Sequence, residues 1–246
     1  MIFYSPNIIN EIKGVEAGFT YALRDKFNVN ASIPGLNFGE NTDVAQTVVA
    51  DNFSRLKYEI RHTGKMALAE QVHESDTHVV SESGFYKGID GLITTEQNLL
   101  IGIKAADCAA LLMADREKSV IAAIHAGWRG AASDILPKAI EEMKAQGANT
   151  KNIYCYISSC ISLNNFEIGE EVAEQFPSSF IDRTIGKKPH LDLKKFLEQQ
   201  LLDKGIQRSN IEIDPRCTIN DLSFYSFRRE RDKAGRMLAF IKQTRI

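Results

Sequence analysis

No stretch of the sequence approaches the ~20 consecutive apolar residues that a membrane-spanning helix needs. The amino-terminal segment also lacks a basic region leading into an apolar run, so we expect a cytoplasmic protein with no membrane partner. A large excess of charge of either sign is lacking too, because 30 basic residues nearly balance 32 acidic ones. The formal net charge of -2 gives no electrostatic basis for binding nucleic acid, so a small-molecule substrate is favoured.

Cysteine is scarce: the chain has four, at positions 108, 155, 160 and 217. Small secreted domains held by disulfides have much denser frameworks, so we expect free thiols, with Cys155 and Cys160 in the core. Low-complexity tracts, repeats and long charge blocks are absent as well. Residues 1–246 are therefore predicted to form a single domain. The sequence carries no signal for an oligomeric state.

Apolar periodicity predicts a mixture of helices and strands. Helices are expected at 44–61, 130–146, 168–176 and 193–203, the last one capped by Asp192 and ended by Gly205. Strands are expected at 66–72, 77–81, 99–105, 109–114, 119–125, 152–158, 211–213 and 236–242. Because the strands outnumber the helices and do not alternate strictly with them, a mixed sheet is favoured over a purely parallel one.

A thiol and two imidazoles follow apolar runs at three points of the chain. Cys108 comes after the run 99–105, His125 ends the run 119–124, and His73 follows the apolar stretch 66–69. Reactive groups gather where strands end, because a rigid scaffold can fix their geometry there. Imidazole and thiolate are the usual ligands of zinc, and three of them leave one tetrahedral position for water or substrate. The alternative is that Cys108 is a small buried hydrophobe and the histidines are structural.

Several blocks of sequence occur together over most of the chain: QVHESD, DGLITT, KAADCAALLMAD, HAGWRG, FEIGEEV, HLDL, RCT and FYSFRRERDKAGR. In this order they resemble the YfiH-like family, historically called the multicopper polyphenol oxidase or laccase domain, whose members are understood as zinc-dependent purine nucleoside phosphorylases. The resemblance implies an α+β fold of layered mixed β-sheets flanked by helices, and zinc bound by His73, Cys108 and His125. It also implies phosphorolysis of adenosine, inosine, guanosine and methylthioadenosine, with adenosine deaminase as a side activity.

The same resemblance points to substrate-binding residues. The stretch GLNFG is similar to the family's SLNLG and favours Asn37 near the site. Arg24 is the nearest match to an arginine of the family's N-terminal region, although the glycine pair that follows it in the family is missing. Arg228 and Arg229 match the family's FSYRRDG-like motif, and their guanidinium groups suit the bidentate binding of phosphate.

The expected catalytic residues are Cys108, His125 and Asp107. Cleavage of an N-glycosidic bond develops positive charge on the ribose and negative charge on the departing base. A carboxyl group beside the metal centre, either Asp107 or Asp90, is expected to supply a proton.

Three other functions compete with phosphorolysis. A multicopper oxidase needs several coppers and many imidazoles, but the chain has five histidines and the proposed trio can hold one metal. A metal-independent cysteine hydrolase would use Cys108 as the nucleophile and His125 as its base. A non-enzymatic interaction module would have a closed zinc site, with Cys217 as the fourth ligand.

Overall fold

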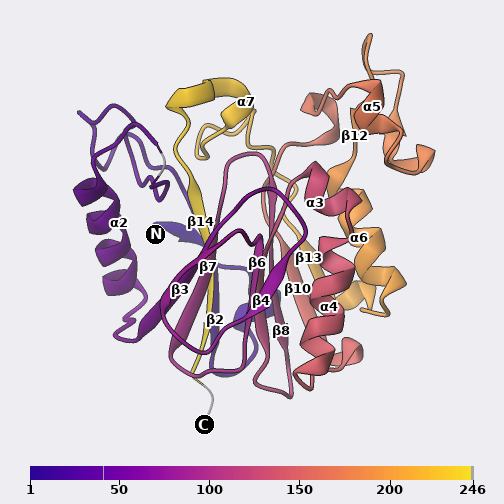
Figure 1. Cartoon of the computed structure of the whole chain (residues 1–246). Coiled ribbons are helices and arrows are strands. Elements are labelled where there is room, and N and C mark those ends of the chain that lie inside the picture. Colours follow the sequence, from indigo (N-terminus) through magenta and orange to yellow (C-terminus); the bar gives the residue numbers. More distant parts are fainter. Residues whose placement is uncertain (41, 245–246) are drawn as a thin grey trace.

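The computed structural model describes residues 1–40 and 42–244, and two six-stranded β-sheets form its centre (Figure 1). The first has the order β1 (Phe3–Tyr4), β2 (Val15–Thr20), β14 (Met237–Gln243), β7 (Leu99–Ala105), β3 (Lys65–Glu70) and β5 (Gly84–Lys87). The second has the order β13 (Ile211–Ile213), β10 (Ile153–Ile157), β8 (Ala109–Asp115), β9 (Ile121–Ala126), β6 (Gly91–Thr94) and β4 (Thr77–Val79). A small ribbon consists of β11 (Ile181–Asp182) and β12 (His190–Leu191). Both large sheets mix parallel and antiparallel pairs, as predicted.

Helices cover the outer faces of this pair of sheets. Leu56 of α2 packs with Phe240 on the first sheet, whereas α4 and α6 cover the second sheet over side chains such as Met113. In the described ranges, no helix is long and apolar enough to cross a membrane. The helices are α1 (Asn7–Asn10), α2 (Gln46–Glu59), α3 (Trp128–Ala132), α4 (Ile135–Ala145), α5 (Glu170–Ala173), α6 (Leu193–Asp203) and α7 (Phe227–Glu230).

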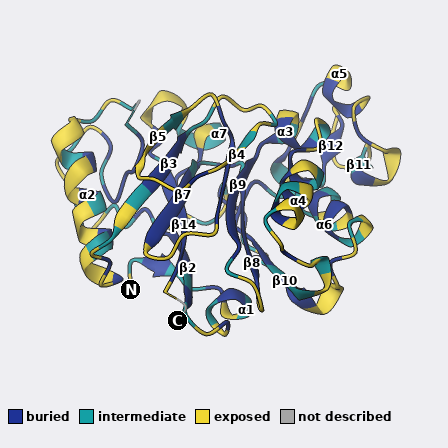
Figure 2. Cartoon of the chain, turned by 60° about the horizontal axis from the view of Figure 1, so that its bottom comes forward, coloured by how far each residue is buried: buried dark blue, intermediate teal, exposed yellow. Residues whose placement is uncertain are grey.

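The main core lies between the two sheets. Leu112 of β8 faces this core together with Ile103 of β7, while its neighbours Leu111 and Met113 face the helices. This alternation follows from the two-residue period of a strand. Because both faces of the second sheet are covered, every residue of β8 is buried (Figure 2). The structure therefore confirms the α+β class with layered mixed sheets flanked by helices in one domain.

Helix 193–203 and strands 99–105 and 211–213 have the predicted bounds. The remaining predicted strands lie within a few residues of their expected ends. The predicted helix at 130–146 is wrong as a single element: α3 and α4 are separated at Asp134, whose φ of 60° is left-handed. The one predicted at 168–176 shortens to the four residues of α5. Several elements were not predicted, namely β1, α1, β2, β5, β6, β11 and β12.

The cap of α6 supplies a test of local stability. Asp192 accepts a hydrogen bond from the Lys195 amide at 3.1 Å, which satisfies one donor of the first helical turn. We expect Asp192→Ala to lower the free energy of unfolding by about 1 kcal/mol, measured by urea denaturation. Asp192→Asn keeps an acceptor oxygen and should retain most of that stability. Equal losses in both variants would contradict a capping role.

Candidate functional site

Three predicted metal ligands converge at one edge of the two sheets. His73 follows β3, Cys108 lies between β7 and β8, and His125 is near the end of β9. One ligand atom from each residue lies within 4.8 Å of the other two. The imidazole rings of His73 and His125 meet edge to face, with centroids 4.9 Å apart and an interplanar angle of 89°. The tertiary fold thus assembles a group that no local spacing motif specifies.

The carboxylate of Asp90 holds two of these residues in place. It is fully buried, and one oxygen lies 2.7 Å from Nδ1 of His125. The same carboxylate accepts hydrogen bonds from the amides of Val72, His73 and Glu74 at 3.0–3.1 Å. Burial opposes ionisation, but the contact with His125 and the amide donors outweigh it and hold the pKa of Asp90 below its ordinary value. Because Asp90 occupies Nδ1, Nε2 of His125 is left to act as a ligand.

Two backbone positions around the centre are left-handed. His73 has a φ of 64°, and Asp107, which precedes Cys108, has a φ of 79°. Non-glycine residues seldom adopt such angles, and strain of this kind persists where the surroundings fix it. At His73 the surroundings are the hydrogen bonds that backbone amides donate to the Asp90 carboxylate. At Asp107 they are hydrogen bonds from Thr218, Ser226 and the Arg228 amide.

The donor set and the open space beside it fit a single metal ion. Tetrahedral zinc with nitrogen and sulfur ligands has donor atoms roughly 3.3–3.8 Å apart, so only a small contraction of the trio is required. Gly127 leaves the necessary room: a Cβ there would lie 3.1 Å from Sγ of Cys108 and within 4 Å of both imidazoles. His73 is exposed whereas His125 is buried, so the trio opens to solvent on one side.

Cys217 is not brought into this group. Its sulfur accepts hydrogen bonds from the Ser162 amide at 3.4 Å and from Nδ2 of Asn165 at 3.3 Å. Among the residues that the structure describes, the group that could hold a metal ion consists of His73, Cys108 and His125 alone. A closed four-ligand zinc site completed by Cys217 is therefore not formed by this arrangement.

Cys108 and His125 form a coupled acid–base pair. Burial disfavours the thiolate, yet the charge and hydrogen bonds of His125 and His73 outweigh it and lower the pKa of Cys108. Burial likewise disfavours the imidazolium, but the neighbouring Cys108 and Asp90 raise the pKa of His125. The sulfur is thus poised to be a thiolate, which is the form that binds metal or attacks an electrophile.

The trio lies in the wall of a cavity of about 610 Å³, a size that suits a small organic ligand. Aromatic side chains, cationic side chains and the metal-ligating group all face this space. The lining residues are Gly39, Glu40, Thr42, Glu70, Gln71, Val72, His73, Lys104, Ala105, Ala106, Asp107, Cys108, His125, Gly127, Trp128, Arg129, Ile161, Phe166, Leu193, Phe227, Arg228 and Arg236.

Asp107 borders the cavity, but both of its oxygens are occupied. Oδ1 accepts a hydrogen bond from Thr218 at 2.6 Å, and Oδ2 accepts bonds from Ser226 and from the Arg228 amide at 3.1 and 2.6 Å. An amide can only donate, so Oδ2 acts as an acceptor in its bond with Arg228. The arrangement favours a positioning role, in which Asp107 fastens the Cys108 loop to the C-terminal segment, over the proton donation expected from the sequence.

The four predicted substrate-binding residues divide into two groups. Arg228 lines the cavity, with its guanidinium 5.8 Å from the ring centroid of Phe166. Asn37 is fully buried and does not line the cavity, because its amide oxygen accepts bonds from the amides of Gly39 and Arg236. Arg24 and Arg229 are also absent from the lining.

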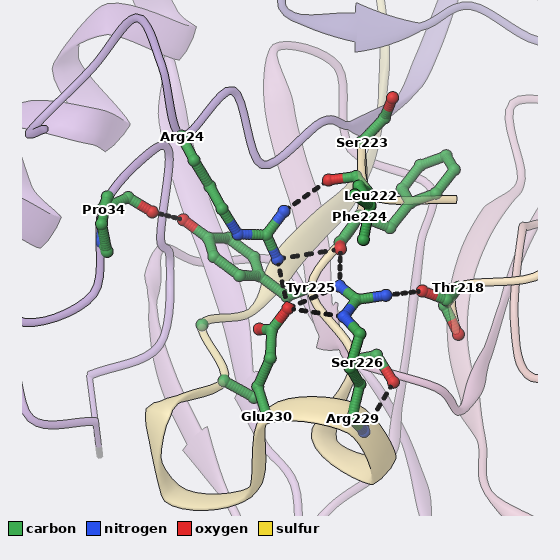
Figure 3. A network of polar contacts seen from close by, with 12 residues as sticks. Arg24, Pro34, Thr218, Leu222, Ser223, Phe224, Tyr225, Ser226, Arg229 and Glu230 are labelled. Atoms are coloured by element: carbon green, nitrogen blue, oxygen red, sulfur yellow. Dashed lines mark hydrogen bonds and ion pairs between the residues drawn. The ribbon is translucent and has the colours of Figure 1, made fainter. Parts of the chain in front are cut away.

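Arg24 and Arg229 instead share one acid inside a polar network (Figure 3). Both guanidinium groups contact the Glu230 carboxylate, and both donate to the Phe224 carbonyl. Arg229 also donates to the carbonyl of Thr218 at 2.7 Å. Their guanidinium groups are therefore already hydrogen-bonded within the protein. They hold the segment that brings Arg228 to the cavity.

Sequence reasoning did not predict Lys104 as a cavity residue, placed Arg236 only in a basic cluster that could be a solvated face or an anion clamp, and named Asp90 only as a source of a proton. Lys104 opens the same segment that contains Cys108, and Arg236 follows the arginine cluster closely, so both were within the motifs already singled out. The motifs did not show which basic side chains are already bonded to backbone carbonyls or acids of the same protein. That distinction depends on tertiary contacts.

The chain is similar to known proteins in both sequence and structure. The family model described as multi-copper polyphenol oxidoreductase laccase matches residues 22–244. The solved structure of the hypothetical protein YfiH from Bacillus licheniformis has a TM-score of 0.87 and 26% identity to this chain. That likeness covers 96% of this chain and 95% of the YfiH chain.

Two curated relatives have names that describe chemistry. A purine nucleoside phosphorylase from Corynebacterium glutamicum is 34% identical over 203 residues, which are 79% of this chain and 81% of the relative. An adenosine deaminase from an unknown prokaryotic organism is 32% identical over 158 residues, which are 61% of this chain and 60% of the relative. Both names describe enzymes that act on purine nucleosides.

Removing the charge of Asp90 tests how the centre is held. In Asp90→Asn, the anion that orients His125 and the loop of His73 is lost, so we expect zinc affinity to fall by about 10–100-fold. The dissociation constant would be measured by competition with a chromophoric chelator, with circular dichroism to verify folding. Asp203→Asn, at the exposed end of α6, should leave the affinity unchanged. A folded Asp90→Asn protein that binds zinc as tightly as the wild type would contradict this role.

Proposed function

The chain belongs to the YfiH-like family of multi-copper polyphenol oxidoreductase laccase proteins, and from this premise we propose that it is a zinc-dependent purine nucleoside phosphorylase. Its relatives make it a member of a family of purine nucleoside-processing enzymes. The proposed substrates are adenosine, inosine, guanosine and methylthioadenosine, each cleaved with phosphate. The proposed enzyme is a single domain of residues 1–246 that works in the cytoplasm.

One observation carries the proposal: the His73–Cys108–His125 group opens into a cavity that has both aromatic and cationic walls. A nucleoside presents a flat base and a polar sugar, and phosphate presents negative charge, so one cavity can take both substrates. The two imidazoles and the thiolate would hold the zinc, with the fourth tetrahedral position left for substrate or water. When bound, zinc supplies a Lewis acid that polarises an oxygen atom.

The residues of the chain account for binding and orientation in this reaction. A phosphate oxygen forms a bond to the anomeric carbon of ribose while the N-glycosidic bond breaks, and the electron pair of that bond leaves with the base. Positive charge on Arg228 offsets the charge of phosphate, because guanidinium binds phosphate oxygens well. Asp107 keeps the Arg228 amide and the Cys108 loop in a fixed relation. The Arg24–Glu230–Arg229 network supports the same segment from behind.

The family description mentions several coppers, but we do not propose copper chemistry for this protein. The trio can hold one metal ion, and five histidines in the whole chain are too few for a multicopper centre. The deaminase relative supports adenosine deamination as a side activity of the same cavity. Both activities would then depend on the same three ligands.

The Cys108–His125 pair favours a second candidate, a cysteine hydrolase that works without metal. The lowered pKa of the thiol and the raised pKa of the imidazole are what a nucleophile and its base require. Chelation separates the two candidates, since removal of the metal would abolish phosphorolysis and leave the hydrolase active.

Release of free purine from adenosine and inosine tests the main proposal. We expect release by the purified protein to require phosphate, and to fall by at least about 100-fold in Cys108→Ala, because one of three metal ligands is lost. Cys155→Ala removes a buried core thiol that does not line the cavity and serves as the matched control. Release that is independent of phosphate, or unchanged in a folded Cys108→Ala protein, would overturn the proposal.

A further inference from the structure

The cavity contains an arginine, Arg236, that forms no ion pair with an acid of the described residues. Arg236 follows α7 and lines the cavity, and its Nη1 donates to the carbonyls of Ala234 and Gly235 at 2.6 and 3.0 Å. No carboxylate of the described chain forms an ion pair with it, in contrast to Arg24 and Arg229, which share Glu230. Burial lowers the pKa of Arg236, and the charges of Cys108 and Asp107 raise it. A partly desolvated guanidinium without an ion-pair partner is a site for an anionic ligand.

The position of Arg236 is fixed by the loop that contains Asn37. The buried amide oxygen of Asn37 accepts a hydrogen bond from the Arg236 amide at 2.8 Å, and the Phe38 amide donates to the Arg236 carbonyl at 3.0 Å. Gly39 completes the clamp, because a Cβ at that position would lie only 2.8 Å from Cγ of Arg236. The lack of a side chain at Gly39 therefore lets the stem of Arg236 pack against the loop. The GLNFG stretch, which resembles a family motif, thus has a physical role: it positions a cavity residue.

Lys104 provides a second cation on the same wall. Leu238, two residues after Arg236, is the register partner of Lys104 in the pairing of β14 with β7. The Lys104 ammonium is mostly buried and lies 2.9 Å from Glu40, and both residues line the cavity. Glu40 pairs with Lys104 and leaves the Arg236 guanidinium without an ion-pair partner of its own among the described residues. The ring of Phe227 flanks it, with the Arg236 guanidinium 5.7 Å from the ring centroid.

We propose that Arg236, supported by Lys104, is the oxyanion subsite of this cavity and binds the phosphate that attacks the nucleoside. This assignment rests on the proposed function. A tetrahedral oxyanion could also be the 5′-phosphate of a nucleotide, since the same guanidinium chemistry binds both. Inorganic phosphate is the source to which the proposal commits, because the curated relative is named as a phosphorylase of nucleosides.

Kinetics of variants that keep the metal ligands test the subsite. In Arg236→Gln we expect the KM for phosphate to rise by about tenfold or more, while the KM for inosine changes less than about twofold and the zinc content is unchanged. Arg236→Lys keeps the charge without the fork and should restore part of the phosphate affinity. Lys233→Gln removes one positive charge from an exposed position of the same segment and is the matched control.

Gly39→Ala provides an independent variant, because it displaces the stem of Arg236 without removing a charge. We expect it to raise the KM for phosphate in the same direction as Arg236→Gln. If the KM for phosphate is unchanged in folded Arg236→Gln, or rises equally in Lys233→Gln, the assignment is wrong.

Direct binding separates this inference from the proposed function. Equilibrium dialysis with radiolabelled inorganic phosphate, and in parallel with adenosine 5′-monophosphate, measures the subsite without turnover. Phosphate binding by the wild type that is lost in Arg236→Gln supports the subsite even if no purine is released, which would be a failure of the proposed function alone. Binding of the nucleotide only, or equal phosphate binding by both proteins, overturns the assignment.

Discussion

The buried carboxylate of Asp90 is the interaction on which the site depends. It receives Nδ1 of His125, which belongs to the second sheet, and three amides of the loop that follows β3 in the first sheet. One side chain therefore joins two ligands that come from different sheets and fixes a left-handed backbone at His73. A buried charge of this kind is tolerated only when its hydrogen bonds are satisfied, and here every donor also serves to orient the site.

The third ligand comes from the place where the chain crosses between the sheets. Cys108 lies between β7 of the first sheet and β8 of the second, so the crossing itself delivers the thiol to the edge where the histidines lie. Asp107 secures this crossing to the C-terminal segment, and that segment brings Arg228 and Arg236 to the cavity. The layered architecture and the candidate site are thus two consequences of the same connections.

The sequence was sufficient for elements that depend on local pattern and for the convergence of His73, Cys108 and His125. Helix 193–203 was predicted from its periodicity and from the cap at Asp192, and the ligand trio was predicted from polar residues at strand ends and from the family motifs. Prediction failed where a long-range contact decides the outcome. The break at Asp134 is different, because Pro137 in the first turn of α4 is a local sign of a helix start that the periodicity of 130–146 obscured. Arg24, Arg229 and Arg236 have the same chemistry in sequence, and only the position of Glu230 separates the paired arginines from the free one.

The most direct test of the account is anomalous X-ray diffraction at the zinc absorption edge, from crystals of the protein grown with one equivalent of zinc. We expect one strong peak, about 2.0–2.1 Å from a nitrogen of His73 and of His125 and about 2.3 Å from the sulfur of Cys108, with no fourth protein ligand. A peak coordinated by Cys217, or the absence of a peak at the trio, would contradict an open catalytic metal centre.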